Sequence, residues 1–473
     1  MIMSATRSNV TIWVLLCSLF TVALFPAAKP DHSPDRYDAR QYLAAAINLH
    51  DNGIFSEVDG SNSGPGTGRE PAYATFLAGL MFFDTQLASI TLECLRSADG
   101  CGAERYRFAI ILNRVFVALS GALIFLSVFR LTDHSLFPSA ISGLYIWLNF
   151  ESQKFSSYVI SDSLAMFLSA ILIWSIFHAG HRDSALWWAI SGFVMALLVL
   201  TKAIFLYFAL LVIPLFLFLT LTSDDRRRTF RNALICFLCC AVPVSAWIAR
   251  NVAVDDLWGV TEGRGEITVS AREIYNDMTF TEYFAAMVYW TRIKGDGLAH
   301  VLFSQETLGK LRHDTSDGFF QRGHKRFSEL VERKKTAENI SYEAASKEVY
   351  DQLLERVLKR PVRHFFTTAL LAYRGVWIDQ FAPFGVLASF FIIISAARRR
   401  NYVVLFALFP SVFAFIFYPL ISLNVPRYQM VTIPAFALAS GMFAVRFNHK
   451  LMEVKKRWSS RNFLKRKGER NSI

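Results

Sequence analysis

Residues 203–221 read AIFLYFALLVIPLFLFLTL, a run that contains no charged side chain. A helix of about 20 apolar residues crosses the hydrocarbon core of a bilayer, so this run predicts a membrane span. Lys202 stands directly before the run, and the basic cluster Arg226–Arg228 lies shortly after it. Because Lys and Arg are enriched in cytoplasmic loops, the cluster predicts a cytoplasmic end there and puts Lys202 on the non-cytoplasmic face.

The composition of the whole chain agrees with this local pattern. Of its 473 residues, 53% are hydrophobic and 43 are Phe, which is more apolar surface than a soluble domain can bury. Other runs of this kind occupy residues 10–27, 108–129, 136–150, 164–178, 185–200, 233–249, 381–396, 403–420 and 431–445. We therefore predict an all-α polytopic membrane protein, a bundle of about ten to eleven transmembrane helices.

The net charge of +12 does not indicate a nucleic-acid partner. The basic residues gather in Arg226–Arg228 with Arg231, in Arg398–Arg400 and in the tail 450–470, and each cluster adjoins an apolar run. Clusters in such positions orient membrane spans and contact anionic lipid. The partners that we expect for these clusters are therefore membrane lipids, not nucleic acid.

The orientation of the spans follows from the same residues. We interpret 10–27 as a retained first span with Arg7 inside, not as a cleaved signal peptide. The later basic loops, which include Arg130 and Arg182, then all fall on the cytoplasmic side. This agreement requires that the stretch 72–92 does not cross the membrane, and its polar residues favour a juxtamembrane or re-entrant helix.

The spans divide the chain into four predicted regions. These are an N-terminal transmembrane region, a non-cytoplasmic soluble segment, a C-terminal transmembrane region and a basic cytoplasmic tail, at residues 1–250, 251–365, 366–447 and 448–473. The first region includes a helical outside loop, 29–107. Pro361 marks a break before 365–377, an aromatic-rich helix that we expect at the membrane interface.

The cysteines divide by location. Cys94 and Cys101 share the first outside loop, where oxidising conditions permit a disulfide, and the sequence leaves its formation open. Cys236, Cys239 and Cys240 lie within an apolar run that has no His nearby. We interpret these three as small buried hydrophobic residues instead of metal ligands.

Polar motifs stand at the non-cytoplasmic ends of the spans. In the first loop, Ser33 can cap a helix with Pro34 at its first position, and Asp38 and Tyr42 then share one face before Gly53 ends the helix. The other motifs are Arg69-Glu70-Pro71-Ala72-Tyr73, Ser161-Asp162, Thr201-Lys202, Trp247-Ile248-Ala249-Arg250-Asn251 and Asn424-Val425-Pro426-Arg427-Tyr428. A bundle that only spans lipid has no reason to gather ionisable groups at one face, so this face is the candidate active site.

These motifs, in this order and on this side, resemble the GT-C class of integral membrane glycosyltransferases. The resemblance is to the bacterial relatives of dolichyl-phosphate-mannose protein mannosyltransferase and of lipid A aminoarabinose transferase. The matching residues are Asp38 with Tyr42, 48–56, Arg69-Glu70-Pro71 with Tyr73, Lys202, Arg250-Asn251 and Arg427-Tyr428. In the family pattern an acidic residue can precede the basic one before the proline, whereas here Arg69 comes first.

The resemblance implies a GT-C-like bundle and a transferase of the bacterial inner membrane that acts on the periplasmic side. Such enzymes move one sugar from a polyprenyl-phosphate donor to an acceptor, here lipid A, another glycan or a protein. An acceptor hydroxyl needs a base, and Asp38 is the predicted base, as the resemblance also implies. The departing lipid phosphate needs cations that donate hydrogen bonds to its oxygens. The residues predicted to bind it are Arg69, Lys202, Arg250 and Arg427. A single displacement inverts the anomeric centre.

Supporting roles, near the acceptor or beside these groups, are assigned to Tyr42, Glu70, Asp162 and Tyr428. No cofactor is required by this chemistry. Glu70 and Asp162 are also candidate ligands of a divalent metal ion, although pairing with the nearby Arg residues is the favoured interpretation.

Each assignment has an alternative without chemistry. Asp38 could only stabilise the start of its helix, an effect of about 1 kcal/mol at most. Arg250 and Arg427 could be ordinary snorkelling residues at span ends.

A transporter or lipid flippase would also carry ionisable groups between spans, but near the bilayer midplane. A scaffold subunit would leave Asp38 replaceable, so sugar transfer by an Asp38→Asn variant separates these functions.

Overall fold

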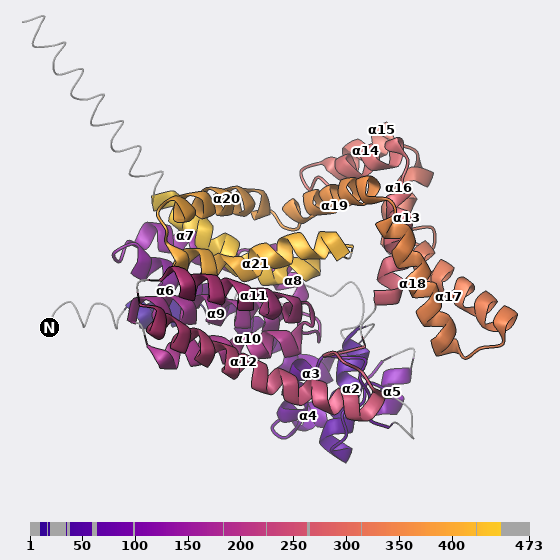
Figure 1. Ribbon diagram of the computed structural model, residues 1–473, viewed down its shortest axis with the longest axis horizontal. Helices are drawn as coiled ribbons and strands as arrows, with labels where there is room; N and C mark the ends of the chain where they lie inside the picture. The colour runs from indigo at the N-terminus through magenta and orange to yellow at the C-terminus, as the bar shows by residue number, and fades with distance from the viewer. Residues whose placement is uncertain are drawn as a thin grey trace, which may run out of the picture.

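The computed structural model describes residues 10–16, 18, 35, 38–58, 64–97, 100–182, 184–223, 225–262, 265–313, 315–421 and 423–445. Within these residues the regular elements are all helices, which confirms the predicted all-α class (Figure 1). Residues 10–16 of the first predicted span are helical, whereas most of that span and the tail 448–473 lie outside the described residues.

Six helices are long and apolar enough to cross a membrane, counted over the described part of the chain. They are α6 (Arg107–Leu131) with the short turn before it, α9 (Asp162–Arg182), α11 (Ile204–Thr222), α12 (Arg226–Asp255), α21 (Tyr402–Ile421) and a last helix, Pro426–Val445, that begins as the 3-10 turn η2 (Pro426–Thr432). The chain is therefore an integral membrane protein, as predicted.

Four further apolar helices in the described residues are shorter than the usual span. They are α3 (Pro71–Met81), α7 (Leu136–Trp147), α10 (Ala185–Thr201) and α20 (Ala382–Arg398). The predicted run 136–150 does not stay helical, because the Asn149 side chain accepts the backbone N–H of Ser152 and begins α8 (Phe150–Phe155). A capping Asn thus divides an apolar stretch that looks continuous in the sequence.

The helices of the bundle differ in how much they are buried. The apolar windows of α9 and of the last helix are each 72% buried, whereas those of α11 and α12 are 22% buried. Apolar side chains on α11 and α12 therefore face outward, as lipid permits. Gly192 allows close packing of α10 on α12, since a Cβ there would stand 2.1 Å from the carbonyl oxygen of Cys236.

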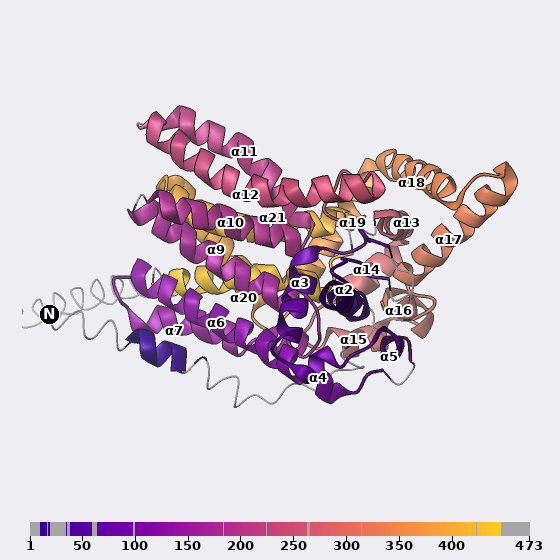
Figure 2. The ribbon, with the colours of Figure 1, turned by 90° about the horizontal axis from the view of Figure 1, so that it is seen from below.

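The helices of the first outside loop gather at one end of the bundle. They are α2 (Asp38–Asn52), α3 (Pro71–Met81), α4 (Thr85–Ala88), α5 (Leu92–Arg96) and the turn η1 (Ala103–Tyr106), and Figure 2 shows them beside the ends of α9 and α10. Asp84 caps α4, so the stretch 72–92 is broken into short helices, which agrees with the prediction that it does not span. Cys94 and Cys101 form a disulfide.

The segment that follows α12 lies at the same end. It contains α13 (Gly265–Asn276), α14 (Phe280–Tyr289), α15 (Gly295–Leu302), α16 (Gln305–Leu311), α17 (Phe319–Glu338), α18 (Tyr342–Leu358) and α19 (Pro361–Val376) (Figure 1). The predicted break at Pro361 is confirmed, because Pro361 is the first residue of α19. α12 itself continues as a helix past the predicted boundary at 250.

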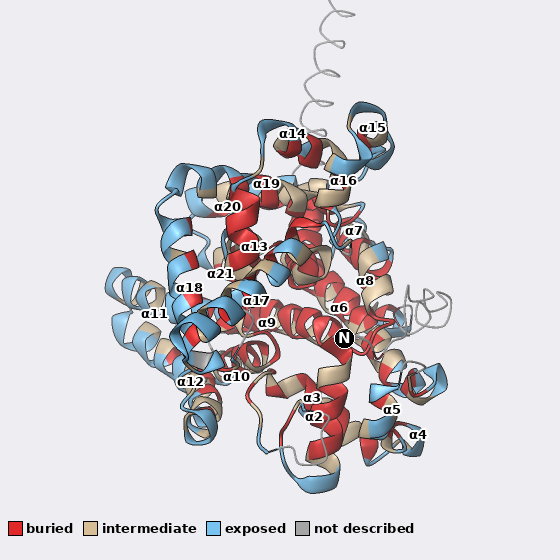
Figure 3. Ribbon diagram, turned by 90° about the vertical axis from the view of Figure 1, so that its right-hand side faces the viewer, coloured by how far each residue is buried: buried red, intermediate tan, exposed pale blue. Residues whose placement is uncertain are grey.

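The opposite end of the bundle collects the basic turns. A cavity of about 500 Å³ there is lined by Gly180, Ser223 and Arg400, which come from the ends of three different helices. Arg398–Arg400 and Arg226–Arg228 are exposed at this end. Figure 3 views the other end of the molecule, where buried backbone of α2, α3 and α9 is surrounded by more exposed helices. The polar motifs and the basic turns are thus separated by the length of the bundle.

Candidate active site

Helix α2 carries two of the predicted residues. Asp38 is in its first turn and Tyr42 lies one turn later, both buried. The helix ends where Gly53 takes a φ of +67°. Asn48 then holds the segment that follows the helix, because its Nδ2 donates to the carbonyl oxygens of Ser56 at 2.8 Å and of Val58 at 3.0 Å. The predicted stop at Gly53 is confirmed, while the predicted cap at Ser33 lies outside the described residues.

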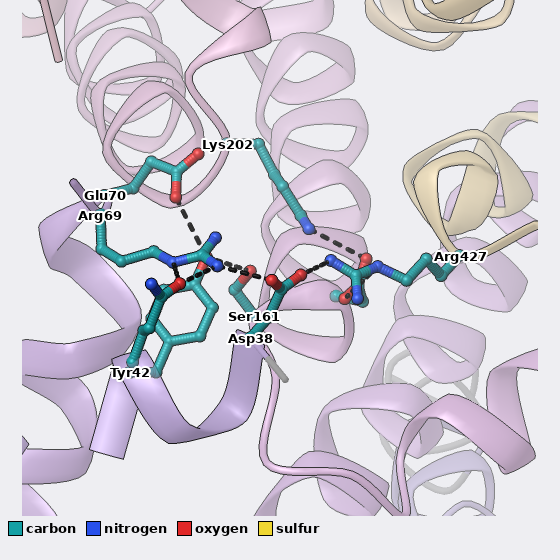
Figure 4. A network of polar contacts seen from close by, with 9 residues as sticks. Asp38, Tyr42, Arg69, Glu70, Ser161, Lys202 and Arg427 are labelled. Atoms are coloured by element: carbon teal, nitrogen blue, oxygen red, sulfur yellow. Dashed lines mark hydrogen bonds and ion pairs between the residues drawn. The ribbon is translucent and has the colours of Figure 1, made fainter. Parts of the chain in front are cut away.

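Asp38 lies between two arginines from distant parts of the chain. Its Oδ1 accepts from Nη2 of Arg69 at 2.5 Å, and its Oδ2 accepts from Nη2 of Arg427 (Figure 4). Asp38 is 6% exposed and Arg69 is 9% exposed. An ion pair removed from water to this degree is maintained only when both charges have partners, so the three groups depend on each other.

A second ion pair lies directly beside this one. Asp162, in the first turn of α9, accepts from Nζ of Lys202 at 3.0 Å. Lys202 caps the C-terminal end of α10 with an extended backbone, at φ −145°. Nε of Arg427 stands 4.0 Å from the other oxygen of Asp162, and both of these buried atoms lack a hydrogen-bond partner. Arg427 therefore joins the two carboxylates and retains one unsatisfied donor.

Glu70 and Tyr42 form the third part of the cluster. The Tyr42 hydroxyl donates to Oε2 of Glu70 at 3.0 Å and lies 3.1 Å from Oγ of Ser161. Glu70 is the N-cap of α3, and its Oε1 accepts the backbone N–H of Ala203 at 3.3 Å. The carboxylate thus connects the first outside loop to the turn that carries Lys202.

Two residues without a predicted role complete the site: Gln41, and Ser161 from the Ser161-Asp162 motif. Gln41 accepts from Nε of Arg69 at 2.8 Å and also from its Nη2, and Ser161 contacts Tyr42 as described. Gln41 follows Asp38 by three residues, which is the helical spacing of neighbours on one face. That spacing is a signal in the sequence, although an uncharged Gln at the start of a helix draws no attention by itself.

The electrostatics of the loop residues follow from burial and from each other. Burial alone would lower the pKa of Arg69, but the Asp38 carboxylate beside it raises that pKa above its ordinary value. Burial raises the pKa of Tyr42 well above its usual range, and the charge of Glu70 adds to this. Arg69 is therefore a permanent cation and Tyr42 a neutral donor at ordinary pH.

Arg250 does not share these contacts. Its guanidinium donates to the carbonyl oxygens of Gly66 at 2.5 Å and of Phe55 at 3.0 Å. It also lies over the rings of Phe55 and Trp247, at 5.6 Å and 4.9 Å. Arg250 thus fixes the two ends of the loop that leads from α2 to Arg69. Tyr428 lies under the guanidinium of Arg427 and stacks on Tyr418 with ring centroids 5.0 Å apart.

The candidate metal ligands have other partners. Glu70 accepts from Tyr42 and Ala203, and Asp162 accepts from Lys202, a cation that a metal ion would have to displace. Across the described residues no group of three His, Cys, Asp or Glu side chains could hold a metal ion. The favoured interpretation of Glu70 and Asp162 had been pairing with Arg; Asp162 pairs mainly with Lys202 instead.

Searches with protein-family models and among curated proteins gave no match. Among solved structures, the chain is similar to the archaeal oligosaccharyltransferase AglB from Archaeoglobus fulgidus in complex with an inhibitory peptide and a dolichol-phosphate. That similarity has a TM-score of 0.47 and 11% identity, and covers 95% of this chain and 52% of the other. The chain thus spans about half the length of that structure.

The chain is also similar to ArnT from Cupriavidus metallidurans. The form bound to undecaprenyl phosphate gives a TM-score of 0.43 and 13% identity over 94% of this chain and 60% of the other. The apo form gives 0.37 and 12% over 93% and 77%.

Proposed function

We propose that this protein is a membrane glycosyltransferase that moves one sugar from a polyprenyl-phosphate donor to an acceptor hydroxyl. The observation that carries the proposal is the buried carboxylate of Asp38 held between Arg69 and Arg427 at one end of an apolar bundle. A base and cations in contact, at the depth of lipid headgroups, are the groups that such a transfer needs.

The cations would bind the phosphate of the donor. The buried Nε of Arg427 has no hydrogen-bond partner. The Lys202 ammonium has three N–H donors, and Asp162 of α9 accepts from one of them. The three cations Arg69, Lys202 and Arg427 face three carboxylates, so the site is close to neutral before a donor arrives. A phosphate that bridges Arg427 and Lys202 would bring one further negative charge, and these cations would bind it in exchange for part of their contact with Asp38 and Asp162.

Donor binding would also release Asp38 for catalysis. While two guanidinium groups occupy its oxygens, Asp38 is a weak base, because both partners stabilise its charged form. Transfer of Arg427 to the phosphate would free one oxygen to accept the proton of the acceptor hydroxyl. The acceptor oxygen then forms a bond to the anomeric carbon, the bond from this carbon to the phosphate oxygen breaks, and the lipid phosphate leaves with inversion.

The remaining predicted residues would act around this pair. Tyr42 and Glu70 fix the loop that carries Arg69, and Tyr428 supports the guanidinium of Arg427. Arg250 was predicted to bind the phosphate of the donor. Its contacts favour a different role, namely holding the loop between α2 and Arg69. No step of this mechanism requires a metal ion.

The sidedness of the charges supports a non-cytoplasmic active site. The basic turns with Arg226–Arg228 and Arg398–Arg400 lie at the opposite end from Asp38, and such turns are typical of the cytoplasmic side. We therefore assign the site to the periplasmic face of a bacterial inner membrane. The acceptor would be lipid A, another glycan or a protein. We propose that the segment after α12, which lies at the same end of the bundle as the site, faces the periplasm with it.

Mass spectrometry of envelope lipids and glycans tests the proposal. A strain that lacks the protein should lose one sugar mass from an acceptor and accumulate a polyprenyl-phosphate sugar, and the wild-type gene should reverse both changes. Unchanged acceptors would contradict a transferase. Accumulation of a lipid on one face of the membrane, with normal transfer in broken membranes, would favour a transporter or flippase instead.

A further inference from the structure

Asn424 lies three residues before Arg427, in the turn between α21 and η2. It is fully buried, and its backbone has a φ of +50°, in the left-handed region that Asn tolerates better than most residues. Pro426, the first residue of η2, fixes the next part of the turn. The backbone between Asn424 and Arg427 therefore has little freedom of its own.

The side chain of Asn424 joins this turn to α19. Its Nδ2 donates to the carbonyl oxygen of Leu371 at 2.6 Å, and its Oδ1 accepts from Nε2 of Gln429 at 2.5 Å. Arg374, also on α19, lies with Nη1 3.5 Å from the carbonyl oxygen of Leu423. Two successive residues of the turn, Leu423 and Asn424, are thus bound by α19.

The contact between α19 and the turn has no spare room. A Cβ on Gly375 would stand 2.6 Å from Nδ2 of Asn424 and 3.2 Å from the ring of Phe415. Gly375 is buried at the C-terminal end of α19. Glycine at this position is therefore what allows the Asn424 amide to lie against the helix.

α19 is itself tied to the membrane helix before the turn. Arg272 of α13 donates through Nε to Nδ1 of His364 at 3.1 Å and through Nη1 to the carbonyl oxygen of Pro419 at 2.7 Å. Pro419 is near the C-terminal end of α21, where carbonyl groups lack helical partners. α13, α19 and α21 thus form one frame around the turn that carries Arg427.

Arg69 is held to the same carboxylate by a separate route. It approaches Asp38 from the loop before α3, and Gln41 of α2 binds its Nε and Nη2. None of these contacts involves Asn424. The two arginines of Asp38 are therefore positioned independently, one by the first outside loop and one by α19.

From this arrangement we infer that Asn424 is a positioning residue that holds the Arg427 guanidinium in place against Asp38 and, on the proposed function, against the donor phosphate. The segment that contains α13 and α19 then belongs to the active site without contacting the reacting groups. Its helices determine where one of the two arginines stands.

Arginine modification by phenylglyoxal, followed residue by residue with peptide mass spectrometry, tests this in the purified full-length protein. Asn424→Gly keeps the left-handed backbone and removes both side-chain hydrogen bonds, and Gly375→Ala displaces the Asn424 amide without changing it. Both should raise the modification rate of Arg427 about fivefold, the effect of about one lost net hydrogen bond, and leave Arg69 unchanged. Gly309→Ala, where a Cβ meets nothing within 4 Å, is the matched control and should change neither rate.

Two results would overturn the inference. One is an Arg427 rate that stays at the wild-type value in both variants. The other is an equal rise at Arg69 and Arg427, which would mean that Asn424 serves the fold in general.

Where transfer can be assayed, Asn424→Gly should alter the KM for the donor or kcat as Arg427→Ala does, and should add nothing in the Arg427→Ala background. Absence of transfer in the wild type would refute the proposed function and leave the modification result standing.

Discussion

The two ends of the helix bundle use the same residue types in opposite ways. At the site end, Arg69, Arg427 and Lys202 each bind a carboxylate, and the groups are largely buried. At the other end, Arg226–Arg228 and Arg398–Arg400 are exposed. Charge alone therefore does not mark a site in a membrane protein, whereas charge that is buried together with its partners does.

The physical reason is the cost of desolvation. A buried charge that loses its partner destabilises its surroundings by several kcal/mol, whereas an exposed one is solvated whatever lies nearby. Substitutions at the two ends should therefore differ greatly in effect.

The largest effect is expected for Asp38→Asn. Loss of the base should reduce sugar transfer in membranes about a thousandfold, within the range that general bases contribute. Asp51→Asn, at the exposed C-terminal end of the same helix, should transfer at the wild-type rate. If transfer survives in Asp38→Asn at more than a tenth of the wild-type rate, Asp38 is not the base.

Arg427→Ala should have the second-largest effect on transfer, because it removes the cation that contacts Asp38 and would bind the phosphate. We expect a loss of about a hundredfold in kcat/KM for the lipid donor, as for removal of one charged donor in other active sites. Arg399→Ala, exposed at the opposite end, should leave kcat/KM unchanged. Equal effects of the two substitutions would remove the distinction between the ends.

Removal of the disulfide should affect stability without affecting the chemistry. The bond between Cys94 and Cys101 closes a short loop in the first outside region, and this loop contains none of the residues that form the ion pairs. Cys94→Ser with Cys101→Ser should lower the free energy of unfolding by about 2 kcal/mol, measured by thermal denaturation. Transfer below the melting temperature should stay at the wild-type level; its loss would tie this loop to catalysis.

The smallest effect is a pH dependence at the frame around α19. Burial and the nearby charge of Arg272 lower the pKa of His364 from 6.5 to about 4, and neutral His364 accepts a hydrogen bond from Arg272. Because the folded state disfavours the protonated ring, this stabilisation is complete above pH 6.5 and is lost as the pH falls to about 4.

His364→Gln keeps an acceptor for Arg272 and does not titrate. Its melting temperature should therefore fall less than that of the wild type between pH 6.5 and 4, the interval given by the shift of His364. The corresponding difference between the two proteins in the free energy of unfolding should be about 1 kcal/mol or less, because the ring is only half-buried. Parallel curves for the two proteins would show that His364 is protonated in the folded state.

The sequence predicted most of the charged cluster because topology constrains it. Asp38, Arg69, Asp162, Lys202 and Arg427 each stand near a span end that is predicted to be non-cytoplasmic, so the predicted orientation brings them to one face. Glycine and proline likewise marked the end of α2 at Gly53 and the start of α19 at Pro361. These are signals with a direct physical cause.

Other features depend on packing that no local pattern encodes. Arg250 has the same position at a span end as Arg427, yet the carbonyl oxygens of Phe55 and Gly66 occupy its donors. Gln41 and Asn424 are uncharged, so nothing in the sequence indicates that Gln41 is buried against Arg69 and Asn424 against α19. Which polar partner a residue meets is decided by contacts between segments far apart in the chain.

The most direct test of the account is the side of the membrane on which each end of the bundle lies. Cysteines introduced as Asp51→Cys and Arg399→Cys, with Cys17, Cys236, Cys239 and Cys240 replaced by Ser, can be labelled in intact cells with a maleimide that does not cross the inner membrane. We expect labelling of the first variant in intact cells and of the second only after the membrane is opened. Labelling of Arg399→Cys in intact cells, with Asp51→Cys protected, would put the charged cluster in the cytoplasm and contradict the proposed transferase site.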